Sequence, residues 1–269
     1  MSAKIMTVCN QKGGVGKTTT AVNLAASFAH RGKRVLLIDL DPQGNATMGS
    51  GIDKNSFRYG TLHVLLGDTA MEQAVLSSPT GHYDVLASNR DLTGVDVRLM
   101  DKPARELCLK NAIAPIADRY DYILIDCPPT LSLLMLNGLA AADSVLIPML
   151  CEYYALEGIS DLLTTIRRIR QTINPKLDIA GVVFVMFTSQ NRLSLEVSSQ
   201  LRNYFGQRVL DTTIPRNVRL AEAPSHGMPA LAYDEKAKGT QAYLDLADEL
   251  LAMKEPPAMQ GYLKKMLVF

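Results

Sequence analysis

The sequence has 269 residues, of which 47% are hydrophobic and 20% are charged, the composition of an ordinary globular protein. Its 28 Lys and Arg residues against 27 Asp and Glu residues give a net charge of +1, which excludes bulk electrostatic attraction to nucleic acid and leaves only local basic patches. The sequence shows no secretory leader and no apolar run of membrane-spanning length, so a cytoplasmic protein is expected.

Strand-like apolar runs alternate with helical stretches along the chain. Strands are predicted at Ile5–Cys9, Arg34–Leu40, Tyr83–Ala87, Tyr122–Cys127, Ser144–Leu150 and Ile179–Phe187, with a short seventh strand ending near Ile214. Helices are predicted at Thr18–Arg31, Ala104–Arg119, Leu131–Ala142, Leu156–Ile173, Arg192–Phe205 and Gly239–Met253. This alternation, with several strands nearly continuous in Val, Ile and Leu, predicts an α/β fold with a doubly wound, mostly parallel sheet and helices on both faces. No linker divides the pattern, so we expect one domain over residues 1–255 and a tail over residues 256–269.

The segment from Gln11 to Thr19 lies between the first predicted strand and the first predicted helix. Its glycines let successive backbone N–H groups turn towards phosphate oxygens, and the helix start adds its positive end. In such a loop Lys17 reaches the β- and γ-phosphates of ATP, and the Thr18 hydroxyl ligates Mg²⁺. The predicted binding residues are Lys12, Gly13, Gly14, Val15, Gly16, Lys17, Thr18 and Thr19. Gln11 stands where the usual motif has its first glycine, and a glycine-rich turn without phosphate is the alternative.

Three aspartates lie at the carboxyl ends of the second and fourth predicted strands or directly after them. Asp39 and Asp41 are two positions apart, so on an extended chain they point the same way, towards the crevice at the carboxyl end of the sheet. We expect Asp39 to hold a Mg²⁺-bound water and Asp41 to orient or deprotonate the attacking water, with a turn-forming Asp-Pro as the alternative. Asp126 ends an apolar strand, which is how a carboxylate is delivered to the Mg²⁺ shell beside such a loop.

The four cysteines, Cys9, Cys108, Cys127 and Cys151, form no Cys-x-x-Cys pair, and no histidine lies beside them at metal-ligand spacing. They are predicted to be buried free thiols in a reducing compartment.

The run from Lys12 to Thr18 resembles the signature of the ParA/MinD family of deviant Walker A P-loop ATPases, and within it the small chromosome-partitioning ParA (Soj) proteins. The resemblance spans about Lys4 to Lys254 and includes the segment from Asp39 to Asn45. It implies a P-loop NTPase fold, weak intrinsic ATP hydrolysis and an ATP-dependent homodimer. In that dimer Lys12 reaches the partner's nucleotide, where a second cation neutralises transition-state charge as an arginine finger does. In relatives the second aspartate, here Asp41, is the one tied to hydrolysis.

The resemblance also assigns roles to later segments. Glu152 matches a glutamate near the dimer interface and the nucleotide, although a simple helix-start residue is the alternative. Pro215 and Asn217 match the loop that wraps the adenine base, and Met186 would lie close by.

Small ParA proteins bind double-stranded DNA without sequence preference as ATP-bound dimers, which implies a nucleoid-associated protein. Such binding rests on phosphate contacts from Lys and Arg. The candidates are Arg192, Arg202, Arg216 and Arg219, with a further cluster at Arg167, Arg168 and Arg170; for each, a solvated basic face is the alternative. Relatives often carry a basic residue where this chain has Ser189-Gln190-Asn191, and Arg192 is the expected replacement.

The resemblance further implies a ParB-type partner that stimulates hydrolysis. Two other functions were weighed. A MinD-like, membrane-associated spatial regulator would use the apolar, lysine-containing end at Gly261–Phe269, but the segment from Asp41 to Asn45 resembles ParA rather than MinD, and a membrane role is not expected. A metabolic enzyme that shares the loop often carries cysteine ligands for an iron–sulfur cluster, and the four scattered cysteines form no such set.

Overall fold

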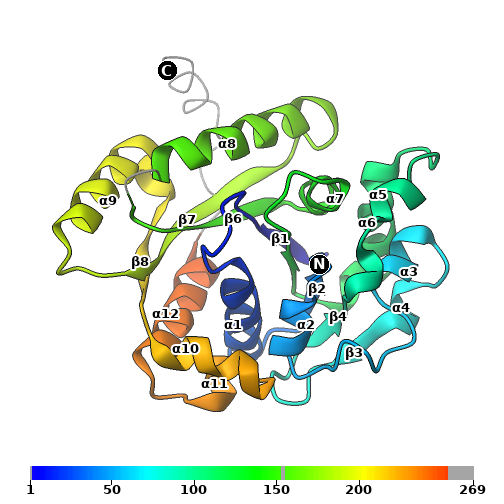
Figure 1. Ribbon diagram of the computed structural model, residues 1–269, viewed down its shortest axis with the longest axis horizontal. Coiled ribbons are helices and arrows are strands. Elements are labelled where there is room, and N and C mark those ends of the chain that lie inside the picture. The colour runs from blue at the N-terminus through cyan, green and yellow to red at the C-terminus, as the bar shows by residue number, and fades with distance from the viewer. Residues whose placement is uncertain (1, 153–154, 254–269) are drawn as a thin grey trace.

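A computed structural model describes residues 2–152 and 155–253 of the chain (Figure 1). These residues form an eight-stranded sheet with the strand order β3-β4-β2-β5-β1-β6-β7-β8. The strands are β1 (Lys4–Val8), β2 (Val35–Asp39), β3 (Val75–Ser77), β4 (Asp84–Leu86), β5 (Tyr122–Asp126), β6 (Ser144–Met149), β7 (Asp178–Phe187) and β8 (Val209–Pro215). Neighbouring strands run parallel except β3 and β4, which are antiparallel. The mostly parallel α/β sheet predicted from the sequence is confirmed.

Helices cover both faces of this sheet. They are α1 (Lys17–His30), α2 (Asn45–Gly49), α3 (Thr61–Leu66), α4 (Met71–Ala74), α5 (Val95–Arg98), α6 (Cys108–Ile113), α7 (Leu133–Ala141), α8 (Ala155–Thr172), α9 (Arg192–Phe205), α10 (Val218–Glu222), α11 (Ala230–Tyr233) and α12 (Lys238–Ala252). One apolar core joins the sheet to α1 and α12, through residues such as Phe28 and Tyr243. A second core joins the opposite face to α6, α7, α8 and α9, through residues such as Leu109 and Leu139. The fold is therefore doubly wound, as predicted.

Strand β2 shows why the central strands read as continuous apolar runs. Successive side chains of a strand point to opposite faces of the sheet. Accordingly, Leu36 and Ile38 belong to the core under α6 and α7, whereas Val35 and Leu37 belong to the core under α1. Because both faces are covered, neither set of positions tolerates polar residues, and the alternation typical of a half-exposed strand is absent.

The sequence prediction was wrong in one helix and missed several short elements. The helix expected over Ala104–Arg119 is divided into two 3₁₀ turns, Arg105–Leu107 and Ala114–Arg119, on either side of α6. Pro115 lies at the start of the second turn, where its missing N–H cannot join an α-helical ladder. Strand β3 and the helices α2 to α5, α10 and α11 have only three to six residues each, too few to show a period.

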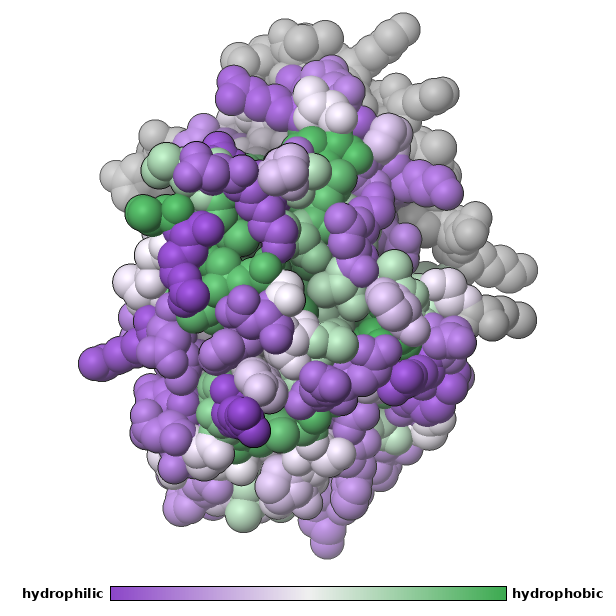
Figure 2. Space-filling model, turned by 90° about the vertical axis from the view of Figure 1, so that its right-hand side faces the viewer, coloured by the Kyte–Doolittle hydropathy of each residue, from purple (hydrophilic) through white to green (hydrophobic). Residues whose placement is uncertain are grey.

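The face of the molecule that carries α3 to α6 is shown in Figure 2. Apolar areas on it are separated by polar side chains, and α5 contributes one of the more exposed apolar residues, Val97, at 70% exposure. Within residues 2–152 and 155–253, no helix is both long and apolar enough to cross a bilayer. The predicted tail at residues 256–269, with the membrane alternative that depends on it, lies outside the described residues.

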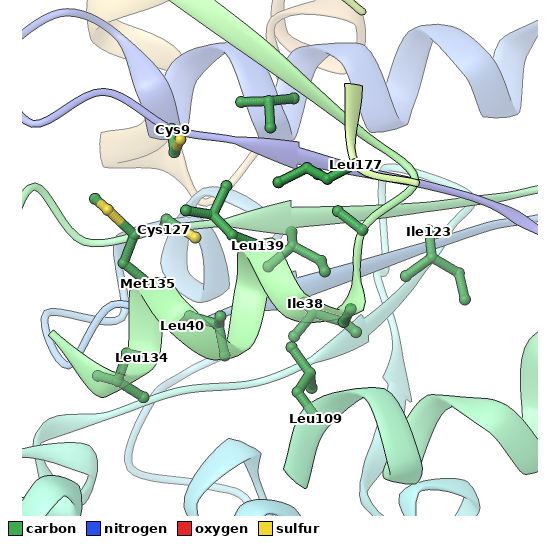
Figure 3. Packing of buried hydrophobic residues seen from close by; sticks show 14 of the residues in the cluster. Cys9, Ile38, Leu40, Leu109, Ile123, Cys127, Leu134, Met135, Leu139 and Leu177 are labelled. Atoms are coloured by element: carbon green, nitrogen blue, oxygen red, sulfur yellow. The ribbon is translucent and has the colours of Figure 1, made fainter. Parts of the chain in front are cut away.

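All four cysteines are buried and free, as predicted. Cys9 and Cys127 directly follow the neighbouring strands β1 and β5, and Figure 3 shows them beside Met135 and Leu139 of α7. Helix α7 lies close to this part of the sheet at Gly138. A Cβ atom placed on Gly138 would lie 2.7 Å from Sγ of Cys127 and 3.3 Å from Cδ1 of Leu40. The absence of a side chain at Gly138 therefore sets how closely α7 packs.

We expect the substitution Gly138→Ala to lower the free energy of unfolding by about 1 kcal/mol, measured by urea titration of the nucleotide-free protein. Overpacking costs about 1–3 kcal/mol, and the better helix propensity of alanine returns up to about 1 kcal/mol. The double variant with Cys127→Ala should recover most of the loss, because the nearest obstructing atom is removed. An equal loss with and without Cys127→Ala would contradict this explanation.

Candidate nucleotide-binding site

The loop from Cys9 to Gly16 joins β1 to α1 at the carboxyl end of the sheet. Gly14 and Gly16 have φ angles of +72° and +71°, which strain any residue with a side chain. Gly16 caps α1 and has no side chain to accept a hydrogen bond from the first turn of the helix. The N–H groups at this helix start are thus left for an external acceptor, and together with the helix dipole they favour an anion.

Lys17 is folded back over the same loop. Its Nζ donates to the backbone oxygen of Lys12 at 3.1 Å, and the residue is only 7% exposed. Burial lowers the pKa of Lys17, and the nearby Asp126 carboxylate opposes that shift. This places the Lys17 amino group against the loop, and its predicted contact with phosphate stays a prediction.

Thr18 and Asp126 meet beside the loop although 108 positions separate them. Thr18 Oγ1 donates to Asp126 Oδ2 at 2.7 Å, because the parallel pairing of β1 and β5 sets Asp126 opposite Val8. Asp126 is fully buried, and its Oδ1 has no hydrogen-bond partner among the residues that the structure describes. Burial, together with the neighbouring Asp39, raises the pKa of Asp126 well above its ordinary value. An unpartnered buried carboxylate oxygen beside a hydroxyl is a donor set that fits Mg²⁺.

Asp39 lies opposite Asp126 in the pairing of β2 with β5, and it is fully buried. Its Oδ2 accepts from the backbone N–H and the hydroxyl of Thr47, both at 2.8 Å, and its Oδ1 accepts from the N–H of Asp41 at 3.0 Å. Burial raises the pKa of Asp39 to about 6. The carboxylate thus fixes the start of α2 beside the site. Its predicted hold on a Mg²⁺-bound water stays a prediction.

Asp41 lies beyond the end of β2, so the strand alternation that predicted a shared direction with Asp39 does not extend to it. The residue is half-buried; its Oδ1 accepts from the N–H of Gln43 at 2.9 Å, and Oδ2 has no partner among the described residues. The loop is fixed at Gly44, where φ is +64° and a Cβ would lie 2.6 Å from the backbone oxygen of Ser88. The predicted action of Asp41 on an attacking water stays a prediction.

Lys12 and Glu152 form an ion pair of 2.7 Å between Nζ and Oε2, so the structure brings these two predicted residues together within one chain. Asn10, which sequence reasoning missed, holds the same region: its Nδ2 donates to the backbone oxygen of Pro148 at 2.8 Å, and its Oδ1 accepts from the N–H of Lys12 at 3.0 Å. Its only sequence signal is a polar residue directly after an apolar strand.

The predicted adenine contacts are placed less directly. Met186 has a φ of +50°, and its Cε would lie 3.9 Å from a Cβ on Gly16, so it lies beside the phosphate loop. Pro215 ends β8. Asn217 caps α10, with its side-chain oxygen accepting from the N–H of Arg219 at 3.0 Å. Contacts of these three residues with a base stay predictions.

Three of the four predicted DNA-contacting arginines have carboxylate partners. Arg192 lies 2.9 Å from Glu196, and Arg202 lies 3.7 Å from Asp211. Arg219 lies 2.8 Å from Glu222 and 3.3 Å from Asp234. Arg216 is exposed and has no carboxylate partner within the described part of the chain. The four residues lie on α9 and around the start of α10, which follow the neighbouring strands β7 and β8 (Figure 1).

Known proteins resemble this chain in sequence and in fold. The AAA-domain family matches residues 3–179 of the chain. The sporulation initiation inhibitor protein Soj of Bacillus subtilis is 47% identical over 249 residues, which are 93% of this chain and 98% of that protein. The chromosome partitioning protein ParA of Myxococcus xanthus is 47% identical over 94% of this chain and 89% of that protein.

A crystal structure of cobyrinic acid a,c-diamide synthase from Mycobacterium smegmatis with bound ADP and magnesium has a similar fold. Its TM-score is 0.82 and its sequence identity 36%, over 93% of this chain and 94% of that one. That protein therefore holds a nucleotide and magnesium on a fold of this kind.

Proposed function

Because the chain belongs to the ParA/Soj family of chromosome-partitioning ATPases, we propose that it is an ATP-dependent dimerising switch that partitions a chromosome or a plasmid. The ATP-bound dimer binds double-stranded DNA without sequence preference on the nucleoid, and a ParB-type partner stimulates hydrolysis. The observation that carries the proposal is the convergence of Lys17, Thr18 and Asp126 on the phosphate loop, with Lys12 at its outer edge.

ATP and Mg²⁺ are the cofactors that this site fits. The backbone N–H groups from Gly13 to Thr19 and the Nζ of Lys17 bind the triphosphate. The Thr18 hydroxyl and the Asp126 oxygen that has no partner among the described residues would hold Mg²⁺, and Asp39 lies beside Asp126 on the neighbouring strand. When bound, the metal neutralises negative charge on the phosphate oxygens.

Asp41 is the residue that acts on the attacking water, through the oxygen that its own turn leaves unused. The partner's Lys12 neutralises charge that develops on the transferred phosphate, so hydrolysis depends on dimerisation. Slow intrinsic turnover suits a protein whose hydrolysis serves timing rather than synthesis.

The DNA-binding surface is the edge that carries Arg192, Arg202, Arg216 and Arg219. Arginines that contact phosphates release counterions, so binding weakens steeply as salt rises. The dimer doubles the number of such contacts, which makes DNA affinity depend on ATP.

Co-sedimentation with DNA tests this function, using the full chain without nucleotide, with ADP, with ATP, and with ATP in excess salt. We expect binding only with ATP, weakened by salt and lost in Arg219→Glu. The variant Asp41→Ala should dimerise and bind DNA with ATP while hydrolysis falls by about 10²-fold or more. Arg119→Glu is the matched control, because this exposed arginine precedes β5 at the opposite end of the sheet.

Two results would contradict the proposal. ATP that brings no DNA binding would remove the physical basis of the partitioning role, and vesicle co-sedimentation would then test the membrane alternative. Full hydrolysis in Asp41→Ala would remove Asp41 from the reaction.

A further inference from the structure

Lys12, the cation proposed to act on a partner's nucleotide, is paired inside its own chain. Its Nζ lies 2.7 Å from Oε2 of Glu152, and the two side chains are 40% and 56% exposed. The pair joins the loops that follow β1 and β6, which are neighbouring parallel strands (Figure 1). Because both side chains reach solvent, a second molecule can approach the ammonium group without unfolding this region.

The backbone of Lys12 is fixed independently of Glu152. Its N–H donates to Asn10 Oδ1, its carbonyl oxygen accepts from Lys17 Nζ, and Asn10 in turn donates to Pro148. Removing the Glu152 carboxylate therefore releases the Lys12 side chain and leaves the loop in place. The ion pair controls where the charge is held, and the amide network controls the shape of the loop.

We propose that Glu152 is an intrachain counter-ion of Lys12, which the dimer must exchange for the partner's triphosphate. The inference rests on the proposed dimerising function and adds a residue that regulates it. Without ATP, Glu152 neutralises the ammonium group that would otherwise face the partner's loop. With ATP, the triphosphate presents several negative charges in place of one exposed carboxylate, so the exchange is favourable.

The weakness of the pair makes it suitable for exchange. An exposed ion pair shifts an equilibrium by roughly 1.5- to 5-fold. A twofold-symmetric dimer breaks two such pairs, one from each protomer. Glu152 should therefore weaken ATP-dependent dimerisation by the square of that factor, or about 2- to 25-fold. A weakening of this size still allows the ATP-dependent dimer to form, and it leaves the dimer labile enough for a stimulating partner to act on.

The experiment is analytical ultracentrifugation of the full chain with a non-hydrolysable ATP analogue. We expect Glu152→Gln to raise the association constant of the dimer by about 2- to 25-fold at low salt. The increase should be much smaller at 1 M salt, where charges are screened within about 3 Å. Asp248→Asn is the matched control, since Arg31 and Asp248 also lie 2.7 Å apart with 34% and 50% exposed side chains, between α1 and α12. That variant should leave the dimerisation constant unchanged.

Lys12→Ala separates this role from a merely structural one. In the Lys12→Ala background, Glu152→Gln should have no further effect on dimerisation, because the group that it releases is absent. Unchanged or weaker dimerisation in Glu152→Gln, or an equal gain with and without Lys12, overturns the inference while leaving the proposed function intact. A wild-type chain that stays monomeric with the analogue refutes the proposed function itself, and this inference with it.

Discussion

The substitution Lys17→Ala is expected to remove ATP-dependent stabilisation and to lower ATP turnover by about 10²- to 10³-fold or more. That range is the effect of deleting one preorganised donor to developing negative charge. Lys17 should lie at the upper end, because it is a charged donor and is only 7% exposed. Its ammonium group has already lost much of its hydration, so binding phosphate costs little further desolvation.

The measurement is the thermal midpoint of unfolding with and without Mg·ATP, followed by steady-state hydrolysis. A ligand present at 100 times its Kd stabilises a fold by about 2.7 kcal/mol, and this increment should vanish in the variant. Lys176→Ala serves as the control, because that exposed lysine precedes β7 at the amino end of the sheet. A Lys17→Ala protein that ATP still stabilises as strongly as wild type would show that the loop does not bind the triphosphate in the proposed way.

The substitution Asp126→Asn should move stability and activity in opposite directions. Without nucleotide, one oxygen of this carboxyl has no partner in the described part of the chain, and burial together with the neighbouring Asp39 raises its pKa. Replacing such a buried ionisable group with a neutral one of the same shape should stabilise the nucleotide-free fold, on the order of 1 kcal/mol. With Mg·ATP the variant lacks the charged metal ligand, and turnover should fall by about 10²-fold or more.

The sign of the pH effect follows from the raised pKa of Asp126. The ordinary aspartate pKa is 3.8, and the pKa of Asp126 in the folded state is higher. At a pH between these two pKa values, the native state holds a proton that the unfolded state has lost. Stability from this group is therefore present below pH 3.8 and is lost as pH rises towards the folded pKa.

Urea titrations across this range, without Mg²⁺, should show a shallower decline in Asp126→Asn than in wild type. A variant that is much less stable than wild type at neutral pH would instead mean that the carboxylate is needed to hold Thr18.

The phosphate loop and the central strands could be predicted because their signals are local. Glycines at positive φ, a lysine at the start of a helix and unbroken apolar runs appear within a few residues of one another. Asp126 could be placed beside the loop because it ends an apolar strand, as a carboxylate that serves Mg²⁺ does in such folds.

What the sequence did not reveal depends on distant partners. Asn10 became recognisable as a tether only when β6 brought Pro148 to it. Asp39 was expected to face the crevice, yet Thr47, eight positions later, takes one of its oxygens. The pairing of Lys12 with Glu152 spans 140 positions and leaves no local pattern. One continuous helix over residues 104–119 was predicted wrongly, because the spacing of apolar residues was given more weight than the helix-breaking effect of Pro115.

The position of β5 between β1 and β2 affects how the protein is made. Two strands on either side of a third are separated by about twice the 4.8 Å strand spacing. A nascent chain that has emerged only as far as residue 121 therefore contains the glycine loop and the first aspartates, but it has no backbone ladder to join them. When Tyr122–Asp126 inserts, it completes the ladder and delivers Asp126 in the same step. A chain that ends before residue 122 therefore lacks the strand that aligns the phosphate loop with Asp39.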